Sequence, residues 1–418
     1  MNKSLARSAM ARTFVCLFVL VAAAGAQTYS VLTSFDGTNG YYVSATPLID
    51  SLGNVFGTAQ YEGASDCGVV YELVNNGGGS YTHETLYDFT CSDDGGNPFG
   101  GVVMDSGGNL YGTAQHNGAY GAGVVYELVN HGDGSYEFEV IHSFSKGKGG
   151  GAFPVGNLVR FKGSLHGVTY GGGGGNCDGG CGAVYRLSKS GGKWVETVLH
   201  VFKDRADGHW PNAGVVVDSA GNIYGTTSLG GSLGYGIVFK LSSQGGSVEI
   251  PSDESSGSYK ETILHSFDGA GDGCYLTSGL IVDSVGNLYG TALMCGDYGD
   301  GTVYQLKHSG SKYQFRVILS FNGTNGEYPY NETSNLALDS AGNVYGTAQE
   351  GGAHSEGTVF KLAAGSFLYT DLHDFNNDGK DGYSPSGGVS LDSLGELYGT
   401  TTLGGSYGYG TVWQIANP

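Results

Sequence analysis

The stretch DSAGNIYGT (residues 218–226) decides the fold, because it recurs along the chain with little change. Five further copies are DSLGNVFGT (50–58), DSGGNLYGT (105–113), DSVGNLYGT (283–291), DSAGNVYGT (339–347) and DSLGELYGT (392–400). A seventh, RFKGSLHGV (160–168), is degenerate but in register, and successive copies are 53–65 residues apart. Asp-Ser-x-Gly-Asn between apolar residues is typical of a tight turn between two antiparallel strands. The repetition indicates an architecture built from repeated units.

Two further segments keep the same period. Each copy is followed by an apolar strand, such as VVYEL (69–73) or TVWQI (411–415), seven in all. A strand that ends in Phe comes next, as in ETILHSF (261–267), but only six of these lie within the repeats, and the seventh, YSVLTSF (29–35), precedes the first copy. This phase offset predicts an all-β protein, a single seven-bladed β-propeller in residues 27–418, closed by the N-terminal strand pairing into the last blade.

The order of the motifs resembles the GloVer-type (Gloeobacter/Verrucomicrobia) tandem-repeat family of secreted bacterial proteins. The repeats of that family read L-Y-G-T-T, a Gly-Gly loop, G-T-V-F-K-L and V-L-H-S-F. Here GNIYGTTSLGGSLGYGIVFKL (221–241) and ETILHSF (261–267) match them closely, and the likeness extends over essentially the whole chain after residue 26. The resemblance implies secretion and propeller-like repeats, and it implies no particular reaction.

Composition limits the class of protein. Glycine accounts for 78 of 418 residues without a Gly-X-Y period, which excludes collagen. A hydrophobic fraction of 39%, with 29 Tyr and 18 Phe, excludes a disordered chain. We therefore expect the glycines at turns and at one crowded position in each blade. The net charge of −20 has the wrong sign for binding phosphate backbones, so we expect no nucleic-acid partner.

Residues 1–26 have the pattern of a signal peptide. Lys3, Arg7 and Arg12 precede an apolar stretch (13–26) that ends in Ala-Gly-Ala, a typical cleavage site. The stretch is too short to span a bilayer, and no second apolar segment follows. We therefore expect a secreted protein, extracellular or periplasmic, that is monomeric and has no membrane span.

Export permits disulfides, and six cysteines follow residue 26. In a propeller, the loops from the fourth strand of one blade to the first strand of the next share a face with the loops between second and third strands. We name this face the loop face. All six cysteines fall in these loops, so we expect the disulfides Cys67–Cys91, Cys177–Cys181 and Cys274–Cys295. Cys177-x-x-x-Cys181 has no second cluster at zinc spacing, which disfavours a zinc site.

The same loops gather acidic and aromatic side chains. Aromatic rings stack on the apolar faces of sugars while carboxylates accept hydroxyl hydrogen bonds, so a carbohydrate-binding surface is one interpretation. The other is that tyrosines fill the loops and acids keep the protein soluble. The candidate ligand-binding residues are Tyr61, Tyr120, Trp210, Tyr235, Tyr298, Tyr328, Tyr407, Asp94, Asp207 and Asp300.

One segment copies the first half of a calcium-binding loop. In Asp374-x-Asn376-x-Asp378-Gly379 the candidate metal ligands are Asp374, Asn376 and Asp378. The twelfth position of a calcium-binding loop is normally Glu, but here it is Pro385, and the positively charged Lys380 lies within the segment. Both features favour a solvated turn over a Ca²⁺ site. We expect no other cofactor.

A histidine recurs two residues before the strand-terminal Phe, at His142, His200, His265 and His373. Equivalent positions on different blades of a propeller are far apart. We therefore expect these histidines to make structural hydrogen bonds and not to share a metal ion.

These patterns predict a secreted, non-catalytic binding or scaffold protein that recognises extracellular carbohydrate or protein through the acidic, Tyr-rich loop face. The alternative is an extracellular carbohydrate-active hydrolase or lyase that uses loop carboxylates as acid and base. A purely structural scaffold is a third interpretation. The sequence contains no G-x-S-x-G, phosphate-loop or H-E-x-x-H motif, so no catalytic residue is assigned.

Overall fold

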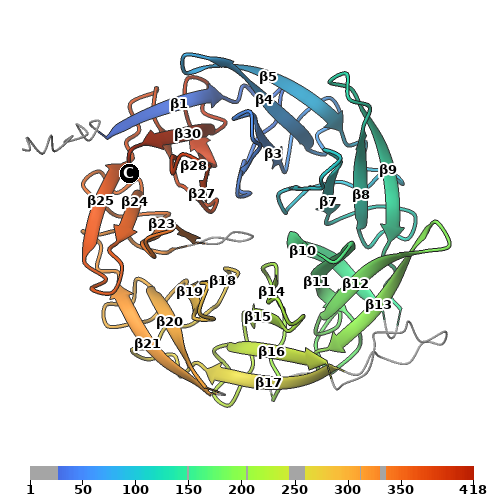
Figure 1. Cartoon of the computed structure of the whole chain (residues 1–418), viewed down its shortest axis with the longest axis vertical. Helices are drawn as coiled ribbons and strands as arrows, with labels where there is room; N and C mark the ends of the chain where they lie inside the picture. The colour runs from blue at the N-terminus through green and yellow to red at the C-terminus, as the bar shows by residue number, and fades with distance from the viewer. Residues whose placement is uncertain (1–26, 148–149, 204–205, 244–258, 311, 330–335) are drawn as a thin grey trace, which may run out of the picture.

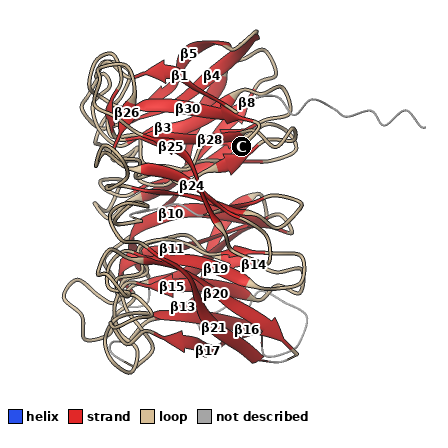
Figure 2. Cartoon of the chain, turned by 90° about the vertical axis from the view of Figure 1, so that its left-hand side faces the viewer, coloured by secondary structure: helices blue, strands red, loops and turns tan. Residues whose placement is uncertain are grey.

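The computed structural model describes residues 27–147, 150–203, 206–243, 259–310, 312–329 and 336–418. The predicted signal peptide lies outside these residues. Seven four-stranded antiparallel sheets surround a central axis, as Figure 1 shows. Seen edge-on, the strands lie between two layers of loops (Figure 2). The predicted all-β, seven-bladed β-propeller is therefore confirmed.

The first four blades each follow one repeat, and their strands run in chain order from the axis outward (Figure 1). Blade 1 consists of β2 (Leu48–Ile49), β3 (Val55–Ala59), β4 (Val69–Gly77) and β5 (Ser80–Asp88). Blade 2 consists of β6 (Val103–Met104), β7 (Leu110–Ala114), β8 (Val124–Asn130) and β9 (Tyr136–Ser143), and blade 3 of β10 (Gly151–Phe161), β11 (Ser164–Gly172), β12 (Ala183–Ser190) and β13 (Lys193–Val201). Blade 4 consists of β14 (Val216–Val217), β15 (Ile223–Thr227), β16 (Ile237–Ser243) and β17 (Tyr259–Ser266).

Blades 5 and 6 repeat this order. They consist of β18 (Ile281–Val282), β19 (Leu288–Ala292), β20 (Thr302–Ser309) and β21 (Lys312–Ser320), and of β22 (Ala337–Leu338), β23 (Val344–Ala348), β24 (Thr358–Leu362) and β25 (Tyr369–Asp374). A separate two-stranded sheet on the loop face pairs β26 (Gly382–Tyr383) with β29 (Leu403–Gly404).

Blade 7 contains segments from both ends of the described chain. Its strand order is β1-β30-β28-β27, built from β1 (Thr28–Ser34), β27 (Ser390–Leu391), β28 (Leu397–Thr401) and β30 (Thr411–Ala416). Strand β1 pairs antiparallel with β30, from Thr28 opposite Ala416 to Ser34 opposite Thr411. The N-terminal strand is thus the outermost strand of a blade whose other three strands are C-terminal.

The recurrent Asp explains why the repeat folds as a hairpin. In blade 4, Asp218 Oδ1 accepts hydrogen bonds from the backbone N–H groups of Ala220 (3.0 Å) and Asn222 (2.8 Å), and Oδ2 accepts from the Asn222 side chain (2.7 Å). Gly221 has a φ of +86°, which a residue with a side chain rarely adopts. The side chain of Asp218 therefore closes the turn between β14 and β15.

The core is divided among the contacts between blades. Seven clusters of buried apolar side chains each combine residues of two neighbouring blades. The repeated glycine of each second strand faces the large side chain of the third, and a Cβ at Gly112 would overlap the Tyr126 hydroxyl. This crowding is the close approach that the repeated glycine predicted.

The three predicted disulfides, Cys67–Cys91, Cys177–Cys181 and Cys274–Cys295, are present. All six cysteines lie in loops of the loop face. Across the described ranges, the chain has no helix of the length and apolar character that a membrane span requires.

Candidate functional site

Each connection from one blade to the next has a residue other than glycine in the left-handed region of backbone conformation, in the loop itself or, for Phe153, in the first residues of β10. The φ values are between 49° and 61°, and a bulky side chain rarely adopts them. We name these seven residues the left-handed set. They are Tyr42, Asn97, Phe153, Trp210, Tyr275, Tyr328 and Ser384.

Backbone hydrogen bonds to two blades hold this conformation. The Trp210 N–H donates to the Cys181 carbonyl of blade 3 (3.0 Å), and the Trp210 carbonyl accepts from the Ser228 N–H of blade 4 (3.1 Å). Tyr328 is held in the same way by Asp300 and Gln349. Such strain costs about 1–3 kcal/mol per residue and persists where surrounding contacts over-determine it.

The backbone does not require the side chains of this set to be aromatic. Asn97 and Ser384 adopt the same conformation, and Asn does so more readily than any aromatic residue. Nevertheless five of the seven positions are occupied by Tyr, Phe or Trp. All seven side chains are at least partly exposed. Aromatic side chains are therefore presented on the loop face at positions whose backbone conformation does not require them.

At the junction of blades 7 and 1, the set extends into a cluster of tyrosines. Tyr41 contacts Tyr42, Tyr61 and Tyr409, with ring centroids 6.0, 6.4 and 5.5 Å away, and Tyr42 also contacts Tyr61 at 5.8 Å. Reciprocal backbone hydrogen bonds between Tyr41 and Tyr61 (2.9 and 3.1 Å) fix the two loops together. Tyr61 is 43% exposed, so the cluster presents preformed aromatic surface to solvent.

Trp210 forms a second aromatic site between blades 3 and 4. Its ring stacks on Tyr170, with centroids 5.6 Å apart and planes inclined by 19°, and His209 packs edge-on at 5.0 Å. Among the described residues, the buried Trp210 Nε1–H has no hydrogen-bond partner. The partly exposed Trp210 and Tyr170 rings form a surface on which a sugar ring can stack, whereas the buried Nε1–H is not accessible to a ligand in this conformation.

The other predicted aromatic residues are distributed around the loop face. Tyr120, Tyr298 and Tyr407 are strongly exposed, at 68, 65 and 63%. Tyr235 packs over Gly269, where a side chain would collide with its ring. Since these residues belong to blades 2, 5, 7 and 4, the structure does not unite them in one pocket.

The predicted acidic residues have different environments. Asp94 accepts hydrogen bonds from the Tyr87 hydroxyl (2.9 Å) and the Thr90 N–H (2.8 Å), so its carboxylate closes its own loop. Asp300 accepts the Tyr328 N–H through its backbone carbonyl. Burial, then the charges of Asp300 and Glu350, raises the pKa of Glu327, which precedes Tyr328. The Asp300 and Glu350 carboxylates therefore lie close enough to the Glu327 carboxyl to raise its pKa, and Glu327 is next to Tyr328 in the chain.

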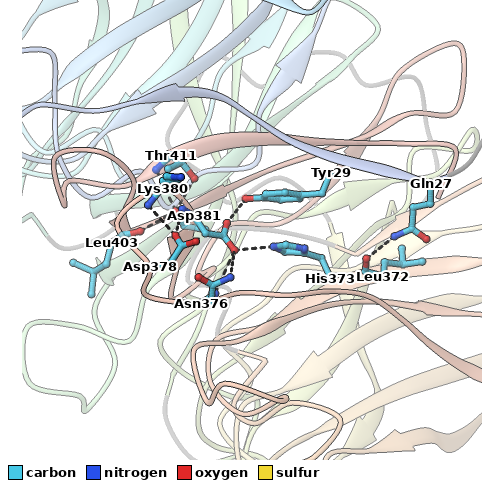
Figure 3. A network of polar contacts seen from close by, with 11 residues as sticks. Gln27, Tyr29, Leu372, His373, Asn376, Asp378, Lys380, Asp381, Leu403 and Thr411 are labelled. Carbon is cyan, nitrogen blue, oxygen red and sulfur yellow. Dashed lines mark hydrogen bonds and ion pairs between the residues drawn. The ribbon is translucent and has the colours of Figure 1, made fainter.

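Most polar atoms of the predicted calcium loop are hydrogen-bonded within the protein, but the buried Asn376 Oδ1 has no partner among the described residues. Asp374 accepts the Ala353 N–H (2.7 Å), and Asp378 accepts the N–H groups of Lys380 and Asp381 (both 2.9 Å). The Asn376 N–H donates to Asp381 (3.2 Å), as Figure 3 shows. These contacts satisfy Asp374 and Asp378 but not Asn376 Oδ1, and Ca²⁺ binding at this loop stays a prediction.

His200, Asp207 and Glu261 form the one group of three His, Cys, Asp or Glu side chains in the described residues whose ligand atoms lie within 4.8 Å of one another. Burial, then the Asp207 charge, raises the pKa of Glu261 to about 8, and burial lowers the pKa of His200. The sequence indicated His200 and Asp207 separately but missed Glu261, because it lies on the outer strand of the next blade.

A cavity of about 450 Å³ lies on the opposite face between blades 3 and 4. Lys162, His166 and Arg186 of the degenerate blade line it, with Tyr259 of blade 4. Arg186 is only 8% exposed, its Nε has no hydrogen-bond partner, and no acidic side chain pairs with it in the described part of the chain. Burial, then the Arg186 charge, lowers the pKa of His166 to about 4. The cavity suits a small anionic group.

Solved structures with a similar fold are distant in sequence. A putative 6-phosphogluconolactonase from Bacteroides uniformis is 12% identical, with 82% of this chain and 88% of that chain covered and a TM-score of 0.52. A hypothetical selenium-binding protein from Sulfolobus tokodaii is 11% identical, with 92% of both chains covered and a TM-score of 0.56. At these identities the likeness shows the fold alone. No curated protein matches the sequence significantly.

The family comparison agrees with the repeats. The model of the Gloeobacter/Verrucomicrobia repeat matches three overlapping ranges, residues 16–180, 80–261 and 251–418. Together these ranges contain all six Asp-Ser copies of the repeated segment and the degenerate seventh copy at residues 160–168. The chain therefore belongs to the Gloeobacter/Verrucomicrobia repeat family.

Proposed function

We propose that this protein is a secreted, non-catalytic binding protein that recognises extracellular carbohydrate through the aromatic residues of its loop face. The observation that carries the proposal is the left-handed set, in which strained backbone positions present five aromatic side chains to solvent. Function is a common reason for such strain to persist. Stacking on flat aromatic surface and hydrogen bonding to acidic side chains are together suited to sugars.

Three disulfides support an oxidising compartment, because such bonds persist mainly in exported proteins. Together with the predicted signal peptide, they support secretion to the periplasm or the extracellular space. A direct test is to express the full chain in a bacterial host and determine the N-terminal residue of the exported product. Secretion as proposed gives a product that begins at Gln27, and retention of residues 1–26 contradicts it.

The binding proposal is tested with residues 27–418 on an array of oligosaccharides, followed by turnover assays on each retained glycan. A binding protein retains a glycan and leaves it intact. If no carbohydrate is retained at millimolar concentration, the proposal is wrong. Protein ligands are then the remaining class for the same surface.

One observation favours the alternative, an extracellular hydrolase or lyase. A carboxyl group with a raised pKa can act as a general acid, and Glu327 has such a pKa and directly precedes the half-buried Tyr328. New reducing ends in the turnover assay would support this function. Their loss in Glu327→Gln, with glycan retention unchanged, would assign Glu327 to the reaction.

A further inference from the structure

The four histidines that lie two residues before a strand-terminal Phe are on outer strands, and the blade contacts at two of them, His265 and His373, share one arrangement. Between blades 4 and 5, His265 Nε2 lies 3.0 Å from Asp272 Oδ2, and Phe315 stacks on the imidazole at 3.7 Å. Between blades 6 and 7, His373 Nε2 lies 2.9 Å from Asp381 Oδ2, and Tyr29 stacks at 3.6 Å (Figure 3). In both, the histidine is hydrogen-bonded and covered by an aromatic ring.

The contact between blades 3 and 4 departs from this arrangement. Glu261 of β17 occupies the place that Phe315 and Tyr29 fill elsewhere, four residues before the histidine position of its strand. His200 Nε2 is 3.8 Å from Asp207 Oδ2 and 3.8 Å from Glu261 Oε1. These separations are too long for hydrogen bonds. Three ligand atoms therefore surround a common point without contacting one another.

The atoms at this point are not satisfied by the protein. His200 Nε2 and Glu261 Oε1 are buried and have no hydrogen-bond partner among the described residues. The three side chains are only 15–19% exposed. Two carboxylates in a partly buried site repel each other, and an unpaired buried charge is unfavourable. No described protein group hydrogen-bonds to these two atoms, so a bound cation would satisfy them.

One of the ligands is already oriented. Asp207 Oδ1 accepts the Lys203 N–H at 3.0 Å, which leaves Oδ2 directed at His200. Outer hydrogen bonds of this kind position carboxylate ligands in metal sites.

We propose that His200, Asp207 and Glu261 bind one divalent transition-metal ion of the Zn²⁺ type at the outer contact between blades 3 and 4. Imidazole and carboxylate are ligands that Zn²⁺ accepts at about 2.0–2.2 Å, and tetrahedral ligands are then about 3.3–3.6 Å apart. The two 3.8 Å separations from His200 need only a small contraction, and all three ligand atoms lie within 4.8 Å of one another. Two carboxylates neutralise the ion, and three protein ligands leave a fourth coordination position open.

The chemistry of the site disfavours other cations. Ca²⁺ takes six to eight oxygen ligands, which three side chains including an imidazole do not provide.

The contact between blades 2 and 3 has a similar but incomplete set of ligands. There His142 Nε2 lies 3.3 Å from Glu196 Oε2, but the following loop (residues 145–154) contains no acidic residue. That contact has two of the three ligands, so we expect it to bind Zn²⁺ much more weakly.

The test uses residues 27–418 after dialysis against a chelator. Zn²⁺ is titrated by calorimetry, and Co²⁺ is titrated by visible absorption, which distinguishes a tetrahedral site from ions on surface histidines. We expect one tight equivalent of Zn²⁺ and visible Co²⁺ bands. Glu261→Phe copies the native arrangement around His265, so it is expected to fold normally and to lose affinity by more than about 100-fold.

His200→Gln is expected to abolish the same binding, whereas Glu196→Gln retains it in full. Circular dichroism and thermal unfolding verify that each variant folds. Failure of the unaltered protein to bind one equivalent of Zn²⁺ overturns the proposal. So does Zn²⁺ binding by folded Glu261→Phe with unchanged affinity, because the site then lies elsewhere.

Discussion

The Tyr29 hydroxyl donates a 2.6 Å hydrogen bond to Asp381 Oδ1, although the two residues are 352 positions apart in the chain. Asp381 also lies 2.9 Å from His373 Nε2 through its other carboxylate oxygen, as Figure 3 shows. Burial, then the Asp381 charge, raises the pKa of Tyr29, so the phenol stays protonated and remains a donor. A polar contact thus links the N-terminal strand to the loop that precedes blade 7.

This contact predicts that Tyr29 stabilises the closed propeller. Tyr29→Phe keeps the ring that stacks on His373 but removes the donor to Asp381. A hydrogen bond to a charged group contributes about 1.5–3 kcal/mol, so the free energy of unfolding in urea is expected to fall by that amount. Tyr120→Phe, at an exposed tyrosine, serves as the control. Equal stabilities of the two variants would contradict the role of Tyr29.

The hairpin aspartates predict acid sensitivity. Burial alone would raise the pKa of Asp218, but hydrogen bonds from Asn222, Tyr224 and Ala220 outweigh it and lower the pKa. The pKa values of Asp105 and Asp339 are lowered in the same way. A carboxyl whose pKa is lower in the folded state stabilises the fold above its unfolded pKa of about 3.9. That stability is lost as the pH falls through the folded pKa.

The measurement is the free energy of unfolding between pH 7 and pH 3. We expect a decline that steepens below about pH 4. Asp218→Asn places an amide against the Asn222 side chain, so it is expected to destabilise the protein by about 1–3 kcal/mol at pH 7 and to flatten the acid decline. An unchanged pH profile in this variant would show that the turn carboxylate does not contribute.

The environment of Arg186 predicts that replacing this residue stabilises the protein. A nearly buried cation without an acidic partner is unfavourable, and replacing buried charges by apolar residues of similar shape can add about 1–4 kcal/mol. Arg186→Met is therefore expected to raise the thermal midpoint, whereas Lys193→Met, at an exposed lysine, leaves it unchanged. If the cavity takes anions, phosphate stabilises the unaltered protein more than Arg186→Met. A large destabilisation of the variant would contradict this account of Arg186.

The disulfides predict unequal contributions to stability. Cys274–Cys295 closes a loop across 21 positions, whereas Cys177–Cys181 spans only four. Removing the former with Cys274→Ser and Cys295→Ser is expected to lower the free energy of unfolding by about 2–4 kcal/mol. The double substitution at Cys177 and Cys181 should cost less, because a short loop restricts the unfolded chain less. The reverse order would contradict this reasoning.

The blades could be predicted because each repeat contains the turn residues and the strand glycine that determine its own local structure. Asp218 and Gly221 specify a turn, and Gly225 marks the close approach to Phe239, so strand order follows from spacing alone. The extra strand before the first repeat placed residues 29–35 beside residues 411–416, where β1 pairs with β30.

The site was less predictable because its residues come together through the ring. Trp210 and Tyr328 precede prolines, and a residue before proline normally favours extended backbone. Their left-handed conformation depends on hydrogen bonds from neighbouring blades, which the sequence does not reveal. The sequence does show that five of the seven residues precede proline, and this recurrence marks the positions without indicating their conformation. Glu261 joins His200 only because two blades meet there.

The central claim is that the aromatic residues of the left-handed set bind carbohydrate. The most direct test is calorimetric titration of the best-retained glycan into the unaltered protein, Trp210→Asn and Tyr275→Asn, since Asn97 shows that asparagine fits this backbone. We predict that each variant unfolds at the normal temperature and binds about tenfold or more weakly, whereas Leu368→Asn, an exposed residue away from the set, binds normally. Unchanged affinity in both folded aromatic variants would contradict the account.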